Sequence, residues 1–278
     1  MFHRIYFQLL SYFFLMLIFL AGCENPADYR FKPKLTVNGE LKAGNPIDSI
    51  YVSWAVDITD RYDTEDQKVH RADVRINGIL LEEYPDLQGA YYYPDTSYRV
   101  SNGEKYRIEV RYGEEMVYSE TRVPSPLKFN SLGVSQGDTV QYIPGTSWFS
   151  EEFFTLVWPE SGDSQIFRII SRADSANPTN FIEDDRIEAE VFKGEPEDRL
   201  NPGIWWVADN YARINWMYFN WRGWHDIIVS AVDSNYYNYR KGVLFGEQSG
   251  QNFNQVVKGG YGLFFSTASD TLRIYLVE

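Results

Sequence analysis

The stretch KYRIEVRYGEEMVYSETRV, residues 105–123, decides the fold class. Large apolar or aromatic residues occupy every second position from Tyr106 to Tyr112, and charged residues lie between them. This period of two puts apolar side chains on one face of a strand and charged side chains on the other. Gly113-Glu114-Glu115 separates this run from a second one, Met116–Val123. We therefore expect a β-hairpin with one face turned toward a core.

A similar hairpin is expected upstream, where Val69–Ile76 and Ile79–Tyr84 are joined by Asn77-Gly78. Asn-Gly between apolar runs is the strongest short-range hairpin signal, because both residues tolerate positive φ. Further strands are expected at Leu35–Leu41, Ser49–Val56 and Tyr91–Tyr93, with a turn at Ala43-Gly44-Asn45-Pro46 and a polar loop at Asp57–Lys68. Short strands at this spacing are typical of β-sandwiches.

Pro124-Ser125-Pro126 follows the last strand of this group and marks a candidate domain boundary. Beyond it, we expect strands at Phe153–Trp158, Gln165–Arg172 and Trp224–Val232. Turn-forming residues after the last of these predict a turn at Asp233–Tyr237.

The N-terminus has the pattern of a secretory signal. Arg4 precedes an almost unbroken apolar run, Ile5–Leu20, which ends in Leu20-Ala21-Gly22-Cys23. This tetrapeptide resembles the bacterial lipobox, which directs lipidation of the cysteine and cleavage just before it. We expect residues 1–22 to be removed and Cys23, the only cysteine, to anchor the protein in a membrane through lipid. An uncleaved anchor is the alternative.

Composition limits the partners of the remaining body. Removal of residues 1–22 takes away Arg4 and leaves a formal net charge of −14. Such a surface repels nucleic acid, so we expect no nucleic-acid partner. Aromatic residues make up 17% of the chain, which favours strands over helices.

The chemical motifs give no candidate catalytic or metal site, and we expect no enzyme activity and no cofactor. His70 and His225 are far apart, and no G-x-S-x-G motif is present. We interpret His225-Asp226 as a pair at a strand end. The acidic runs Glu183-Asp184-Asp185 and Glu195–Asp198 lack an EF-hand pattern and are interpreted as solvated loops.

An unusual concentration of aromatic residues lies between Ile204 and Trp224, which includes five of the eight tryptophans. A strand over Ile214–Trp221 would carry large apolar groups on both faces. One face could enter a core, and the other could meet a loop, a partner protein or a sugar ring. The candidate ligand or partner surface comprises Trp205, Trp206, Tyr211, Trp216, Tyr218, Trp221 and Trp224.

Two resemblances extend these expectations. Thr155–Pro159, Ile166–Ile170 and Ile228–Asp233 resemble the B, C and F strands of a fibronectin type III domain, with an insertion over roughly Asp174–Trp221. Together with the strand pattern, the aromatic content and the length of the mature body, this favours an all-β protein with two β-sandwich domains. The expected division is a signal peptide at 1–22, a lipidated tether at 23–34, an Ig-like domain at 35–124 and a fibronectin type III-like domain at 125–278.

A broader resemblance covers nearly the whole mature chain. It rests on Leu35–Glu40, Ala72–Gly78, Tyr106–Val110, Tyr118–Pro124 and Gly259–Phe264. These segments resemble a DUF 4249-like family of Bacteroidetes outer-membrane lipoproteins, often encoded beside TonB-dependent receptors. The resemblance implies a binding or accessory lipoprotein of the outer membrane that works with such a receptor in nutrient or polymer uptake. A structural or adhesive surface module is the alternative.

Overall fold

The computed structural model describes residues 31–57, 59–60, 63, 65–141, 154–160, 164, 166–176, 178–182, 203–244 and 256–277. The predicted signal peptide, Cys23, most of the tether and both acidic runs at 183–185 and 195–198 lie outside these ranges. None of the described helices is long and apolar enough to cross a membrane.

The protein is mostly β-strand, and the described strands form sheets of nine, four and three strands. The large sheet has the order β13 (Ile204–Val207), β12 (Phe167–Ala173), β15 (Gly223–Val232), β16 (Tyr261–Val277), β1 (Leu35–Lys42), β2 (Ile50–Trp54), β6 (Leu87–Tyr92) and β5 (Glu82–Tyr84), with β10 (Thr139–Gln141) paired to β16. The prediction of a protein built mostly from β-strands is therefore confirmed.

The N-terminal lobe pairs part of the large sheet with the four-stranded sheet. That sheet has the order β4 (Ile79–Leu80), β3 (Asp73–Ile76), β7 (Lys105–Tyr112) and β8 (Glu115–Arg122). The hairpin at residues 105–123 is confirmed. The Asn77-Gly78 hairpin is confirmed for β3 and β4, with φ values of 49° and 81° as a type I′ turn requires, but Glu82–Tyr84 pairs with β6 in the large sheet. The apolar residues of β7 pack with those of β1 and β2 in the first core cluster.

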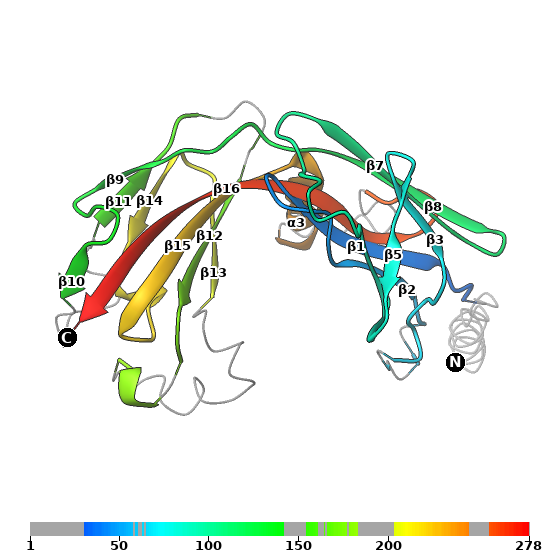
Figure 1. Cartoon of the computed structure of the whole chain (residues 1–278), viewed down its shortest axis with the longest axis horizontal. Helices are drawn as coiled ribbons and strands as arrows, with labels where there is room; N and C mark the ends of the chain where they lie inside the picture. Colours follow the sequence, from blue (N-terminus) through cyan, green and yellow to red (C-terminus); the bar gives the residue numbers. More distant parts are fainter. Residues whose placement is uncertain are drawn as a thin grey trace, which may run out of the picture.

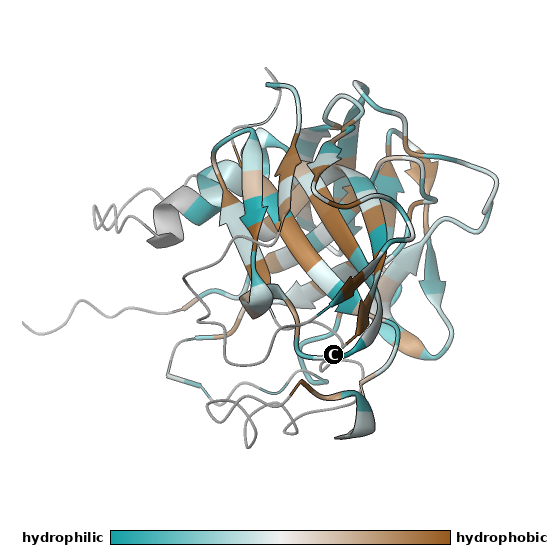
Figure 2. Ribbon diagram, turned by 90° about the vertical axis from the view of Figure 1, so that its left-hand side faces the viewer, coloured by the Kyte–Doolittle hydropathy of each residue, from teal (hydrophilic) through white to brown (hydrophobic). Residues whose placement is uncertain are grey.

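The C-terminal lobe places the other end of the large sheet against the three-stranded sheet, β14 (Tyr211–Ile214), β11 (Phe154–Val157) and β9 (Asn130–Leu132). Leu156 of β11 packs with Ile169 of β12 and Val229 of β15 in the second core cluster. In Figure 2, most of the strongly hydrophobic segments lie on strands.

Strand β16 belongs to both lobes. Its residues Tyr261–Thr267 pair in parallel with Thr36–Lys42 of β1, and Thr267–Leu276 pair antiparallel with β15. Phe264 lies in the first core cluster and Ile274 in the second. The end of the chain therefore completes the N-terminal lobe before it completes the C-terminal one, so residues 125–278 do not pack as one separate unit.

The glycines before and within β16 have a steric reason. A Cβ at Gly262, whose φ is +107°, would lie 2.0 Å from the carbonyl oxygen of Val37. A Cβ at Gly260 would lie 2.2 Å from that of Leu35. Only glycine lets the two backbones approach this closely, which explains the glycine-rich segment that the family resemblance includes.

Two local predictions are wrong. Asp233–Tyr237 was expected to be a turn, but Ser234–Leu244 forms helix α3, with the Asp233 carboxylate accepting a hydrogen bond from the Tyr236 amide at 3.1 Å. Asp-Ser-Asn is a helix N-cap signal as well as a turn signal. The strand expected over Ile214–Trp221 is instead the end of β14 followed by a 3₁₀ turn, η3 (Trp216–Tyr218).

The whole molecule is an arch (Figure 1). The two smaller sheets cover the convex side of the large sheet, and α3 lies beneath β16 on the concave side. Because strand side chains alternate between faces, the residues on β1 and β16 that do not enter a core point to this concave side. Asn38, Glu40 and Lys42 of β1 and Leu263 and Phe265 of β16 are among them.

Candidate binding site

The structure places three of the seven candidate aromatic residues in cores. Trp216 and Tyr218 lie in the second core cluster with exposed fractions of 7% and 6%, and Trp221 is fully buried against Phe181. Burial raises the pKa of the Tyr218 hydroxyl to about 12. These side chains stabilise the C-terminal lobe and do not offer a free surface.

The other four lie at separate places. Trp205 stacks on Tyr218, with ring centroids 4.0 Å apart, and packs against the second core. Trp206 stacks on Tyr236 of α3 at 4.8 Å and also lies under the Arg240 guanidinium at 4.9 Å, so it holds α3 against β13. Tyr211 and Trp224 are exposed, on β14 and β15 respectively. The seven residues therefore do not form one continuous surface.

His225 and Asp226 point to opposite faces of β15, so they do not act as a pair. The His225 ring is fully buried, its Nδ1 donates to the Gly223 carbonyl at 3.1 Å, and its Nε2 has no partner. Burial lowers the pKa of His225 to about 4. The ring is thus a neutral core side chain at physiological pH.

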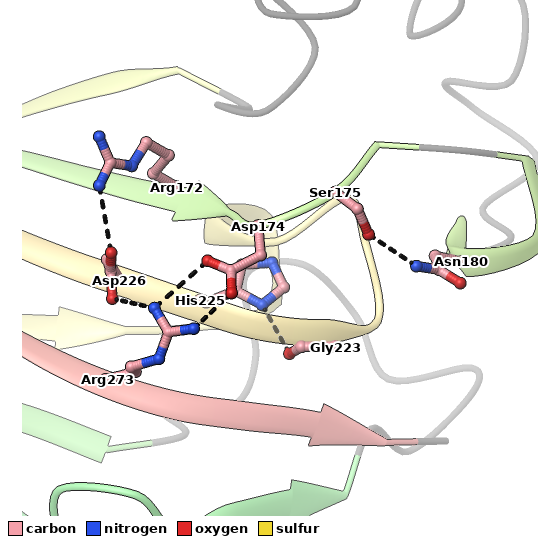
Figure 3. A network of polar contacts seen from close by, with 8 residues as sticks. All are labelled: Arg172, Asp174, Ser175, Asn180, Gly223, His225, Asp226 and Arg273. Carbon is pink, nitrogen blue, oxygen red and sulfur yellow. Dashed lines mark hydrogen bonds and ion pairs between the residues drawn. The ribbon is translucent and has the colours of Figure 1, made fainter.

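Asp226 instead joins a surface network of ion pairs (Figure 3). Arg273 bridges Asp226, at 3.0 Å, and Asp174, while Arg172 reaches the other oxygen of Asp226 at 3.2 Å. The Arg273 guanidinium also lies 5.0 Å from the Trp224 ring centroid. Every charged side chain in this network is paired with one of opposite charge. Such paired charges are typical of a solvated protein surface and leave no carboxylate free to act as an acid or base.

A groove of about 460 Å³ opens on the concave face of the N-terminal lobe. Strands β1, β2 and β16 and the turn between β1 and β2 supply its walls. Its lining consists of Asn38, Gly39, Glu40, Lys42, Asn45, Pro46, Asp48, Ser49, Tyr51, Leu263 and Phe265. The volume falls within the range of small-ligand sites in proteins, and the lining combines apolar with polar groups.

The polar wall of the groove is held in place by neighbours. Oδ1 of Asp48 accepts hydrogen bonds from the hydroxyls of Ser49 and Tyr84. The bond to Asp48, followed by burial, raises the pKa of Tyr84 to about 12. Ser49 has a φ of 55°, a conformation that non-glycine residues adopt rarely and that is often found at functional sites.

Glu40 connects the groove to the C-terminal lobe. Its carboxylate accepts a hydrogen bond from Arg168 of β12 at 2.6 Å and one from Thr267 of β16 at 2.8 Å. Burial opposes ionisation of Glu40, but Arg168 and these hydrogen bonds outweigh it and lower the pKa of the carboxyl. Glu40 is therefore ionised and neutralised by Arg168, not available as a proton donor.

This arrangement suits reversible binding of a small polar molecule. Among the described residues, no three His, Cys, Asp or Glu side chains converge as a metal site would need. The groove could not be read from the sequence, because residues 38–51 and 263–265 line it together and each stretch alone looks like ordinary strands and turns. The one available signal was the polar face of β1, Asn38, Glu40 and Lys42, opposite its buried apolar face.

Comparisons with known proteins add a family. The sequence matches the family described as "Domain of unknown function (DUF4249)" over residues 24–273. No curated protein matches it significantly. Two crystal structures of human protocadherin-24 EC1-2, one of them in form II, are 10% and 11% identical to it and cover 90% of this chain and 99% of their own. Both have a TM-score of 0.18, which is too low to indicate a shared fold.

Proposed function

This chain belongs to the DUF4249 family, and from that membership we propose that it is an outer-membrane lipoprotein with a binding or accessory role. Lipid on Cys23 would hold it to the membrane, after removal of residues 1–22. Its partner would be a TonB-dependent receptor in the same membrane, and the joint task would be uptake of a nutrient or polymer.

The observation that carries the binding role is the groove on the concave face. The convex side of the large sheet is covered by two smaller sheets, whereas the concave side of the N-terminal lobe leaves polar and apolar side chains around a cavity. A sheet face that only needed to be solvated would not require Ser49 in a strained conformation or Asp48 fixed by two hydroxyls.

We further propose that the C-terminal lobe is fibronectin type III-like and the N-terminal lobe Ig-like. The order β13-β12-β15-β16 opposite β14-β11-β9 agrees with strands C and F in one sheet and strand B in the other, as the sequence resemblance implied. Strands β13 and β14, within the expected insertion, are members of these two sheets. The rest of that insertion lies largely outside the described residues.

The role is proposed as binding without catalysis. His225 is buried and neutral, and His70 lies 3.2 Å from Glu83 on the surface of the N-terminal lobe. Neither histidine contacts a serine or threonine hydroxyl that it could activate as a nucleophile in the described structure.

A pull-down from native membranes tests the receptor partnership. The full-length protein would be extracted with mild detergent, and co-purifying proteins and the N-terminal peptide would both be identified by mass spectrometry. We expect a TonB-dependent receptor in stoichiometric amount and a diacylated Cys23 at the N-terminus. A Cys23→Ser variant should lose the lipid and remain unprocessed.

Surface variants would locate the contact. Trp224→Ala and Tyr211→Ala change exposed aromatic residues, whereas Trp216 and Trp221 are buried and their substitution would disturb the core. Absence of any receptor with the wild-type protein would contradict the accessory role. Binding to host or matrix proteins without a receptor would instead support the adhesive alternative.

A further inference from the structure

The groove between β1, β2 and β16 has the chemistry of a carbohydrate site, and we propose that it binds a neutral oligosaccharide. This inference rests on the proposed binding function and specifies its ligand. It draws on three features of the groove: its mixture of hydrogen-bonding groups, its exposed aromatic wall and its charge.

The hydrogen-bonding groups suit hydroxyls, which both donate and accept. Oδ1 of Asn38 accepts from the Leu263 amide at 3.2 Å, which fixes the side-chain amide and leaves its two N–H donors for a ligand. Asp48 keeps its second carboxylate oxygen as an acceptor, because the hydrogen bonds from Ser49 and Tyr84 both use Oδ1. Asn45 and Lys42 add donors at the rim.

The apolar lining suits the C–H faces of a sugar ring. Tyr51 is 46% exposed on β2, so its ring is open to a ligand. Phe265, Leu263 and Pro46 line the groove as well. An aromatic ring beside fixed polar groups offers a stacking surface and hydrogen bonds together.

The charge of the groove argues against other small ligands. Its charged residues are Lys42, Asp48 and Glu40, and Arg168 neutralises Glu40. The remaining Lys42 and Asp48 balance each other, on a body with a net charge of −14, so no cluster of positive charge would attract an anion. A lipid tail would leave these polar groups without hydrogen-bond partners, which is costly.

Preorganisation supports the assignment. The ring of Tyr84, which holds Asp48, stacks on Tyr92 with centroids 4.2 Å apart. Ser49 donates to the same carboxylate. A rigid acceptor loses less entropy when it binds a flexible sugar hydroxyl, so this second layer raises affinity.

Calorimetric titration of the full-length protein tests the proposal. The protein would be kept in a detergent without a sugar headgroup and titrated with neutral hexasaccharides of glucose, mannose, xylose and galactose. We expect one of them to bind, and Tyr51→Ala and Asp48→Asn each to weaken it by about tenfold or more. Tyr112→Ala, which removes a similarly exposed tyrosine on β7 that does not line the groove, should leave affinity unchanged.

Three results would overturn the proposal: no binding of any neutral hexasaccharide, equal affinity in the Tyr51→Ala variant, or binding only of an acidic oligosaccharide or a peptide. The receptor pull-down reports on a different interaction. Receptor capture without sugar binding would leave the proposed function intact and remove only the ligand assignment. Sugar binding without receptor capture would keep the ligand assignment and contradict the receptor partnership.

Discussion

Trp221 and Trp224 stand three positions apart and have very different surroundings. Trp221 is fully buried against Phe181 and Ala173, whereas Trp224 is 37% exposed and contacts Arg273 and Tyr275. We expect Trp221→Ala to lower the free energy of unfolding by about 3–5 kcal/mol, because it opens a cavity. Trp224→Ala should cost about 1 kcal/mol, from lost surface contacts.

Urea denaturation followed by circular dichroism measures both changes. Similar losses for the two variants would contradict the assignment of Trp221 to the core and Trp224 to the surface. The variants change the same residue type within one segment, so each serves as the control for the other.

At the residue scale, the sequence predicted that large aromatic side chains gather near residues 204–224 but not which of them are exposed. A run with apolar residues on both faces has no polar side from which to read its orientation. The burial of Trp216 and the exposure of Tyr211 depend on packing against β11 and β12, which are distant in sequence. The groove was unpredictable for the same reason, since Asp48 and Phe265 meet only after folding.

Helix α3 begins at a buried carboxyl, Asp233, whose protonation affects the stability of the fold. Asp233 caps the helix, is 3% exposed and contacts Thr121, which also bonds Ser266 at 2.6 Å. Burial raises the pKa of Asp233 to about 6, despite hydrogen bonds from Thr121 and the Tyr236 amide that oppose the rise. The Asp233 carboxyl therefore keeps its proton to a higher pH in the folded state than in the unfolded state.

This difference fixes the sign of a pH dependence. A raised folded-state pKa gives a contribution to stability that is full below the unfolded value, 3.8, and is lost as pH rises through about 6. We expect the free energy of unfolding of the wild type, minus that of Asp233→Asn, to fall by roughly 3 kcal/mol across this window. Asparagine keeps the helix cap.

Urea titrations of both proteins at pH values from 4 to 7 measure this difference. His225, whose pKa is lowered to about 4, has the opposite pH dependence but is present in both proteins and cancels. If the free energies of unfolding of the wild type and of Asp233→Asn changed in parallel with pH, the pKa of Asp233 would be the same in the folded and unfolded states, and the prediction would be wrong.

At the element scale, the hairpins were predictable and β16 was not. Asn77-Gly78 and the alternation in residues 105–123 are local signals that outweigh tertiary context. The middle of β16, Ser266-Thr267-Ala268-Ser269-Asp270-Thr271, reads as a polar loop. These small residues are needed because the strand crosses between the two cores there, and Ser266 packs against Thr121 instead of an apolar layer.

At the scale of the whole molecule, the shared strand predicts cooperative unfolding of both lobes. Among the described residues, Trp54 is the one tryptophan of the N-terminal lobe, so fluorescence reports mainly on the C-terminal lobe. Ile108→Ala in the first core cluster should cost about 2–5 kcal/mol. We expect it to lower the urea midpoint seen by fluorescence as much as that seen by circular dichroism.

Ile169→Ala, in the second core cluster, is the matched variant and should shift both signals in the same way. If the fluorescence midpoint of Ile108→Ala stayed at the wild-type value, the lobes would unfold independently, and the pairing of β16 with β1 would contribute little to stability.

The parallel pairing of β1 with β16 also determines how the protein resists mechanical force. A membrane anchor would pull on the start of β1, while a load held by the far lobe would pull on the end of β16. Because the two strands run in the same direction, these forces slide them past each other and stress all hydrogen bonds from Thr36 to Lys42 together. Under such a load the bonds could not open one at a time, so this ladder would resist the force as a shear clamp.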